Sequence, residues 1–325
     1  MVATTALQKQ NPEPSAKATL PRTKRARSTS AKAKVPWTDA EVAPLDLEKP
    51  YEPVPPPVAY EKGKVLPMPN RLYQGECLET LSLWDDNSFE CTITDPPYNI
   101  ARDRKGLSWA FSSHVTIEND WDRFGPQEYE AFTEAWLKEV CRVTKENGNI
   151  FIFGSYHNIY TIGAIASRLD LRVVNSIIWA KPNAQPNITC RMFTESTEQV
   201  IWLANNKSKK AKKWTFNYKH MKELNGGKQM RNYWEIPLTP PREKVHGKHP
   251  SQKPLRLMER IVLAGTNPGD RVLDCFAGSG STLLACDRLE RRWVGIERDD
   301  AYCEIAHSRL DDERRQRRLC SVTPK

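Results

Sequence analysis

The sequence predicts an α/β protein in which helices cover both faces of a parallel sheet. From about residue 70 onward, short apolar runs alternate with amphipathic helical stretches. One apolar run stops abruptly at the segment Thr94–Tyr98, and another passes through the glycine turn Phe276–Gly280 into a helix. Strand ends and glycine turns of this kind form ligand sites in open α/β sheets. The length of 325 residues allows one large domain or two smaller ones.

The charge of the chain is unevenly distributed. Residues 1–35 carry eight Lys or Arg and one Glu, a net +7, and residues 181–250 carry fourteen against five Glu, a net +9. The total is +9, so the rest of the chain is at −7. Residues 1–66 are rich in Pro, Ala, Lys and Ser, which predicts a disordered or extended tail. Two basic parts on an acidic body indicate a bound polyanion, with solvated basic surfaces as the alternative.

The cysteines and the apolar runs exclude several classes of protein. The eight cysteines are scattered and none has CxxC spacing, so we expect neither a zinc cluster nor a disulfide framework. This usage predicts a reducing, cytoplasmic setting. No apolar run approaches the ~20 residues that span a bilayer.

The first half of the ordered part begins near Asn70. We expect a strand at 71–74, a turn through Glu76 and Cys77, a helix at 78–84, and a buried strand from Phe89 to Asp95. Two prolines cannot continue a sheet, so this strand ends at Asp95. The Asp95 carboxylate, the Pro96 carbonyl and the Tyr98 ring are what an exocyclic amine on a nucleobase needs. An ordinary strand exit is the alternative.

The middle of the chain predicts further alternation. A polar segment, 99–119, is long for a structureless connection and is expected to be a functional loop. A helix from Pro126 to about Thr144 should follow. Strands are expected at 149–153, 171–180 and 200–203, with a helix at 158–169. The pattern then degrades from Lys181 to His249, where lysines are interleaved with aromatic residues.

The last part predicts a nucleotide-binding layout. A helix from Pro254 precedes the strand 270–275, the glycine turn and a helix from Leu283. Glycines let the backbone approach a ligand closely. The next strand, 291–296, ends on Glu297, which can accept bonds from ribose hydroxyls. We expect a last helix at 301–310 and a highly charged, solvated end at 311–318.

These motifs, in this order, resemble the beta class of DNA amino-methyltransferases. The Asp-Pro-Pro-Tyr motif comes first, and the segment from His249 to Pro254 precedes the strand of the glycine turn, as in that class. The resemblance implies a Rossmann-like methyltransferase sheet with circularly permuted motif order. It implies a methyltransferase domain over 67–325 with a target-recognition region inserted at about 182–248. The cofactor would be S-adenosyl-L-methionine and the substrate double-stranded DNA, with the target base flipped out of the helix.

The resemblance also implies roles for individual residues. The catalytic set is Asp95, Pro96, Pro97 and Tyr98. The cofactor-binding set is Glu76, Cys77, His249, Ser251, Lys253, Asp274, Phe276, Ala277, Gly278, Ser279, Gly280 and Glu297. The DNA-binding set is Arg102, Arg104, Lys105, Arg191, Lys209, Lys210, Lys212, Lys213 and Arg231. No metal is expected, and a homodimer and a cognate restriction endonuclease are partners that the class allows.

Adenine N6 is favoured over cytosine N4 as the methyl acceptor. In the family, Ser in place of Asp95 is commoner among cytosine enzymes. The segments 121–124 and 242–244 resemble elements of adenine members. Glu76 is a mild departure, because an Asp is common at its position in the family. The alternatives are cytosine-N4 methylation, an RNA or protein-glutamine substrate, and a DNA-binding protein that keeps the fold without catalysis.

Overall fold

The structure is a computed structural model, and it describes residues 65–99, 124–187, 190–206 and 213–322. The predicted tail, up to residue 64, lies outside the described residues. So does all but the first residue of the predicted loop 99–119.

The described part of the chain forms one mixed sheet of eight strands. Their order is β1 (Arg71–Gln74), β8 (Arg292–Glu297), β7 (Arg271–Asp274), β2 (Phe89–Thr94), β3 (Thr144–Gly154), β5 (Thr197–Ala204), β4 (Arg172–Ala180) and β6 (Tyr233–Glu235). The prediction of a parallel sheet holds for every described strand except β5, which runs against both of its neighbours. The described residues between β4 and β5 contain no helix, which is the usual crossover between parallel strands. Strand β5 instead returns antiparallel beside β4.

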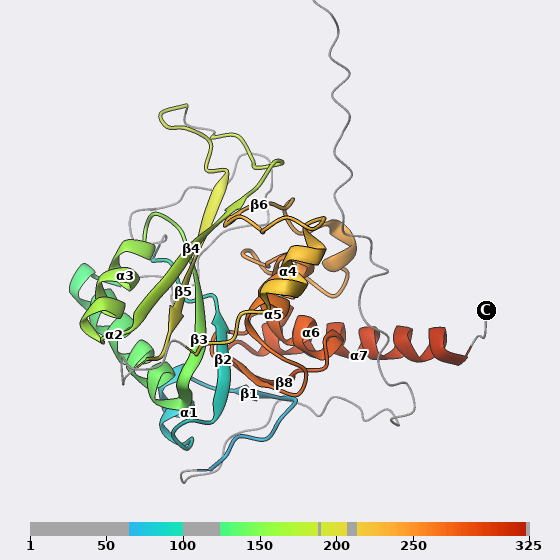
Figure 1. Ribbon diagram of the computed structural model, residues 1–325, viewed down its shortest axis with the longest axis horizontal. Helices are drawn as coiled ribbons and strands as arrows, with labels where there is room; N and C mark the ends of the chain where they lie inside the picture. The colour runs from blue at the N-terminus through green and yellow to red at the C-terminus, as the bar shows by residue number, and fades with distance from the viewer. Residues whose placement is uncertain (1–64, 100–123, 188–189, 207–212, 323–325) are drawn as a thin grey trace, which may run out of the picture. The chain divides into compact units, whose positions relative to one another are not determined.

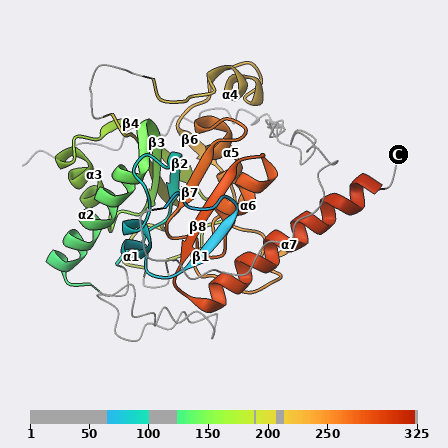
Figure 2. The ribbon, with the colours of Figure 1, turned by 90° about the horizontal axis from the view of Figure 1, so that it is seen from below.

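Helices cover both faces of the sheet, as predicted (Figures 1 and 2). One face packs against α1 (Cys77–Ser82), α2 (Pro126–Val143) and α3 (Ile159–Arg168), and the other against α5 (Leu255–Gly265), α6 (Ser281–Arg288) and α7 (Asp300–Val322). Strand β3 shows why both faces are apolar. Ile150 and Ile152 join the core under α1 to α3, whereas Phe151 and Phe153 join the core under α5 to α7. Successive side chains of a strand point to opposite faces, so a strand buried on both sides is apolar throughout.

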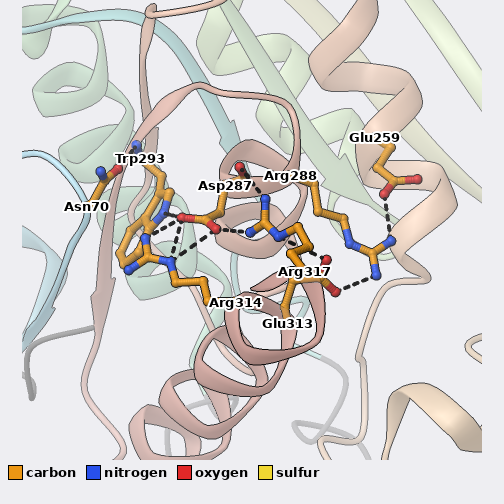
Figure 3. Close-up of polar contacts among 8 residues, drawn as sticks. All are labelled: Asn70, Glu259, Asp287, Arg288, Trp293, Glu313, Arg314 and Arg317. Carbon is orange, nitrogen blue, oxygen red and sulfur yellow. Dashed lines mark hydrogen bonds and ion pairs between the residues drawn. The ribbon is translucent and has the colours of Figure 1, made fainter. Parts of the chain in front are cut away.

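The predicted last helix, 301–310, was too short, because α7 continues to Val322. Its charged side chains are paired with acids and bases of α5 and α6 (Figure 3). Asp287 of α6 accepts hydrogen bonds from Arg314 and Arg317 of α7. Arg288 of α6 pairs with Glu313 of α7 at 2.6 Å, and with Glu259 of α5 at 3.1 Å. The predicted charged end, 311–318, is therefore only partly solvated: Arg315 and Arg318 are exposed, whereas Arg314 and Arg317 are partly buried.

The predicted target-recognition region contributes to the sheet. Both β5 and β6 fall within 182–248. A further helix, α4 (Tyr218–Leu224), packs Met221 and Leu224 against Ala264 of α5, and a short 3₁₀ turn covers Pro241–Glu243. None of the helices in the described ranges is both long and apolar enough to cross a membrane.

Candidate active site at the carboxyl edge of the sheet

The carboxyl ends of four parallel strands meet at one edge of the sheet. Asp95 follows β2, Asp274 ends β7, Glu297 ends β8, and Glu76 follows β1 shortly before α1. These four acids line one cavity of about 760 Å³. Ligand pockets of ordinary size run from about 300 to 1,000 Å³. The edge of the sheet therefore forms a site large enough for a nucleoside cofactor and part of a substrate.

The cavity brings together nearly all of the predicted catalytic and cofactor-binding residues. The four residues from Asp95 to Tyr98 line it. Its wall also contains the predicted cofactor residues Glu76, Cys77, His249, Ser251, Lys253, Asp274, Phe276, Ala277, Gly278, Ser279 and Glu297. Gly280 does not line it. A Cβ there would lie 2.8 Å from the Cβ of Ala306, so this glycine lets α6 begin close against α7.

Gly278 lets the glycine turn pack closely against the His249 ring. Its φ is +51°, and a Cβ would lie 2.9 Å from Nε2 of His249. The His249 ring packs edge-on against Tyr302 at 4.2 Å, and Oγ of Ser251 lies 3.5 Å from Nδ1 of the same ring. Burial and the positive charges of Lys253, Arg309 and Lys244 lower the pKa of His249 to about 3. The imidazole is therefore uncharged at neutral pH and serves as a flat wall.

The carboxylate of Glu297 links the glycine turn to the end of β8. Its Oε2 accepts the backbone N–H of Gly278 at 2.7 Å, and its Oε1 accepts those of Arg298 and Asp299, each at 2.9 Å. Burial raises the pKa of Glu297, although these three hydrogen bonds oppose the rise. A carboxylate has about four acceptor positions. One acceptor position on Oε2 therefore remains for a ligand hydroxyl.

The other predicted cofactor residues differ in exposure. Glu76 is about half exposed and pairs with Arg298 at 3.0 Å, whereas Cys77 is buried. Oδ1 of the buried Asp274 accepts the hydroxyl of Thr94 at 2.9 Å and the N–H of Phe276 at 3.2 Å. Burial raises the pKa of Asp274 to about 7, against these hydrogen bonds.

Asp95 is held by two donors. The Tyr98 hydroxyl donates to Oδ1 at 2.7 Å, and the Lys253 ammonium lies 2.5 Å from Oδ2. Lys253 was predicted to bind the cofactor, and its ammonium pairs with the carboxylate of the predicted catalytic set. The hydroxyl of Tyr129 on α2 donates to the Pro97 carbonyl at 2.8 Å, which anchors the turn after β2.

Two further residues belong to this group and are not among the residues predicted from the sequence: Glu198 and Lys181. Oε2 of Glu198 lies 3.3 Å from Lys253 Nζ and accepts the Tyr98 hydroxyl at 3.2 Å. Its Oε1 accepts from Lys181 at 3.2 Å. The reason for the omission is the direction of β5. In a parallel β5, Glu198 would begin the strand at the opposite edge of the sheet, whereas the antiparallel pairing of β5 places it beside the end of β3.

Burial and pairing set the charges of this group. Burial raises the pKa of Asp95, and Glu198 adds to the rise while Lys253 opposes it. Burial would also raise the pKa of Glu198, but the ammonium groups of Lys253 and Lys181 outweigh it and lower that pKa. Burial would lower the pKa of Lys253, yet the two carboxylates raise it. Lys253 is therefore an ammonium shared by two acids.

The predicted DNA-binding residues are only partly described. Arg191 is exposed on the connection between β4 and β5, and residues Lys181 and Gln185 of that connection line the cavity. Lys213 and Arg231 are also exposed. The remaining members, Arg102, Arg104, Lys105, Lys209, Lys210 and Lys212, lie outside the described residues.

Comparisons with known proteins agree with this geometry. The family model N6_N4_Mtase, described as DNA methylase, matches residues 89–308. The type II methyltransferase M2.DpnII of Streptococcus pneumoniae is 39% identical over 269 residues, which cover 82% of this chain and 94% of that protein. The crystal structure of the M1.HpyAVI–SAM complex is 29% identical with a TM-score of 0.55, covering 74% of this chain and 98% of that one. The cytosine-N4-specific PvuII DNA methyltransferase shares the fold, with a TM-score of 0.57 at 18% identity, covering 80% and 94% of the two chains.

Proposed function

This chain belongs to the N6_N4_Mtase family of DNA methylases, and we propose that it methylates the N6 amine of adenine in duplex DNA. The methyl donor is S-adenosylmethionine, the ligand of a similar solved structure. The observation that carries the proposal is the Asp95 carboxylate, which lies beside the glycine turn in one cavity. The same cavity therefore contains a hydrogen-bond acceptor for an amine and a glycine turn that can bind a nucleoside.

The choice of adenine rests on the residue at position 95 and on the relatives. Asp95, rather than Ser, begins the motif after β2. The type II methyltransferase M2.DpnII aligns over most of both chains. The likeness to the cytosine-N4 enzyme concerns the fold, because the identity is only 18%. Cytosine N4 is the second candidate, since its exocyclic amine needs the same hydrogen-bond acceptors as that of adenine.

The residues of the glycine turn and the neighbouring strand ends fit this cofactor. Gly278 keeps the turn free of a side chain, the His249 ring and Phe276 provide apolar walls, and Oε2 of Glu297 keeps an acceptor position for a ribose hydroxyl. When bound, the cofactor supplies an electrophilic methyl group on a positively charged sulfur. The role of the chain is to hold that group near Asp95 and to exclude water.

The chemistry asked of Asp95 follows from the amine. The lone pair of an exocyclic amine is delocalised into the ring, so the nitrogen is a poor nucleophile. We infer that Asp95 and the Pro96 carbonyl accept its two N–H bonds and direct the lone pair at the methyl carbon. As the N–C bond forms, the bond between the methyl carbon and the cofactor sulfur would break and the sulfur would leave as a neutral thioether. The nitrogen would then carry the positive charge until one of its N–H protons passes to solvent. Asp95 stabilises this charge by position and electrostatics, without a covalent enzyme intermediate.

Access to the base requires that it leave the DNA stack. Unstacking costs about a few kcal/mol, and one stack on an aromatic ring returns roughly 1–3 kcal/mol. We propose Tyr98 as that ring. Exposed basic side chains, among them Arg191, Lys213 and Arg231, would contact DNA phosphates and supply the rest of the free energy of unstacking. Region 182–248 would read the base edges.

The partners and setting that we propose follow the relatives. Type II methyltransferases such as M2.DpnII support a cognate restriction endonuclease as a companion. We further propose a homodimer that acts in a reducing cytoplasm, where its described cysteines remain the free thiols seen in the structure.

Replacing Asp95 tests the proposed site. Asp95→Ala removes the acceptor for the amine and leaves the glycine turn intact, so methyl transfer to DNA should be abolished while S-adenosylmethionine still binds. Labelled methyl transfer measures the first and calorimetry the second. Glu146→Ala is the matched control, since this exposed acid lies on β3 near its opposite end. A variant that keeps more than about a tenth of the wild-type rate, ~1.4 kcal/mol of barrier, would overturn the role of Asp95.

A further inference from the structure

Two hydrogen-bond donors in the site are shared between Asp95 and Glu198. The Tyr98 hydroxyl lies 2.7 Å from Oδ1 of Asp95 and 3.2 Å from Oε2 of Glu198. The Lys253 ammonium lies 2.5 Å from Oδ2 of Asp95 and 3.3 Å from the same Oε2 of Glu198. Both donors are closer to Asp95, and a single oxygen of Glu198 is the second acceptor for each.

This arrangement conflicts with the task of Asp95. Each of its oxygens already accepts a strong donor, and these two donors draw electron density from the carboxylate, which weakens it as an acceptor for the substrate amine. The side chains of Asp95, Lys253 and Glu198 have little contact with solvent, since they are 18%, 6% and 15% exposed. A buried donor that loses its acceptor costs free energy. The donors can therefore leave Asp95 readily only if another acceptor is already in place.

We propose that Glu198 is a positioning residue that takes over the Tyr98 hydroxyl and the Lys253 ammonium when the substrate amine binds Asp95. This inference rests on the proposed function. A phenol has a single O–H, so the Tyr98 hydroxyl can donate fully to only one of its two acceptors. Moving it to Glu198 exchanges one hydrogen bond for another. A small movement of each donor would free Asp95.

Lys181 prepares Glu198 for this role. Its ammonium holds Oε1 of Glu198 at 3.2 Å, which leaves Oε2 directed at Tyr98 and Lys253. The sheet also fixes the backbone of Glu198, which pairs with that of Trp179 on β4. The acceptor thus needs little rearrangement before the reaction.

A simpler role for Glu198 is to balance the charge of Lys253. The two roles differ in their dependence on Tyr98. If Glu198 accepts hydrogen bonds from both donors, removing the Tyr98 hydroxyl removes one of these bonds, and the loss of Glu198 then matters less. If Glu198 only balances charge, the hydroxyl does not matter to it. A double-mutant cycle between Glu198→Gln and Tyr98→Phe therefore separates the two roles.

The expected result is a kinetic defect without a binding defect. Glu198→Gln should lower kcat roughly 10- to 100-fold, the range for losing a charged hydrogen-bond acceptor, while the S-adenosylmethionine Kd changes by less than about twofold. In the Tyr98→Phe background, the same substitution should cost at least about threefold less. An equal loss in both backgrounds, or a kcat of Glu198→Gln within about twofold of wild type, would overturn the proposal.

Two further variants keep the test decisive. Glu146→Gln is the matched control: it removes the same charge from an exposed acid near the opposite end of β3, and none of the contacts of Asp95 or Lys253 given above involves it. Its kcat should equal that of wild type. If Glu198→Gln does not fold, as judged by lost cofactor binding, Glu198→Asp replaces it in the cycle, with a smaller loss of kcat and the same dependence on Tyr98.

The failure of this inference can be told from failure of the proposed function. All cycle measurements are ratios to a wild-type enzyme that methylates DNA, and the Asp95→Ala experiment tests that activity separately. Loss of activity in Asp95→Ala with no coupling between Glu198 and Tyr98 leaves the function in place and removes only the acceptor role of Glu198.

Discussion

At the scale of single residues, the site contains a buried acid, Asp274, whose ionisation costs free energy. Asp274 is buried at the end of β7, and burial raises its pKa to about 7, although hydrogen bonds from Thr282, Thr94 and the Phe276 N–H oppose this. In the unfolded chain the group returns to an ordinary aspartate pKa of about 3.9. The folded protein therefore binds a proton that the unfolded chain has lost between these two values. Stability contributed by this group is lost as pH rises through that window.

The variant Asp274→Asn makes this effect measurable. The amide oxygen can still accept the bonds from Thr94 and Phe276, but it cannot ionise. The free energy of unfolding of the variant, relative to wild type, should rise by about 1.4 kcal/mol per pH unit between about pH 5 and about pH 7. Urea unfolding at several pH values checks this. Using the difference between the proteins cancels the opposing contribution of His249, whose lowered pKa favours the fold at higher pH. A pH-independent difference would mean that Asp274 ionises normally in the fold.

At the scale of elements, α7 is attached to the domain by ion pairs in addition to apolar contacts. Asp287 of α6 receives Arg314 and Arg317 of α7 and the indole N–H of Trp293 at 3.2 Å (Figure 3). Burial would raise the pKa of Asp287, but the two guanidinium groups outweigh it and lower that pKa. The ion pairs thus add stability above the ordinary aspartate pKa, and this stability is lost as pH falls through the lowered value.

Asp287→Asn should destabilise the protein by roughly 3 kcal/mol at neutral pH, because two partly buried guanidinium groups lose their carboxylate. Urea unfolding measures the loss. Asp312→Asn is the control, and this acid lies on α7 itself. Asp312 is 40% exposed and pairs with His246 at 2.7 Å, so its replacement should cost less than about 1 kcal/mol. Equal effects of the two variants would show that Asp287 does not anchor α7.

The elements also show what sequence can and cannot predict. Strand β2 and the glycine turn are local signals, since two prolines stop a strand and a left-handed turn needs glycine at position 278. The direction of β5 is not local, because it depends on how the chain returns from β4. Glu198 was missed for that reason, although Asp95 and Lys253 were found. The length of α7 was missed because the partners of its charges lie on α5 and α6.

At the scale of the whole molecule, a site forms because distant segments end at one edge of the sheet. Asp95, Glu198 and Lys253 come from the end of β2, the start of β5 and the segment before α5. The order of the two main motifs along the chain still favours a permuted member of the family, and that permutation stays a prediction. The same cavity contains the glycine turn, so cofactor and amine are expected to meet without a large movement of the sheet.

The central claim is that this site methylates N6 of adenine. The most direct measurement incubates the purified chain with labelled S-adenosylmethionine and unmethylated bacterial DNA, then separates the nucleosides of the digested product. The account predicts the label in N6-methyldeoxyadenosine. Label in N4-methyldeoxycytidine would keep the role of Asp95 and contradict the choice of base. No transfer, together with no binding of the cofactor, would contradict the account and indicate a DNA-binding protein on a methyltransferase scaffold.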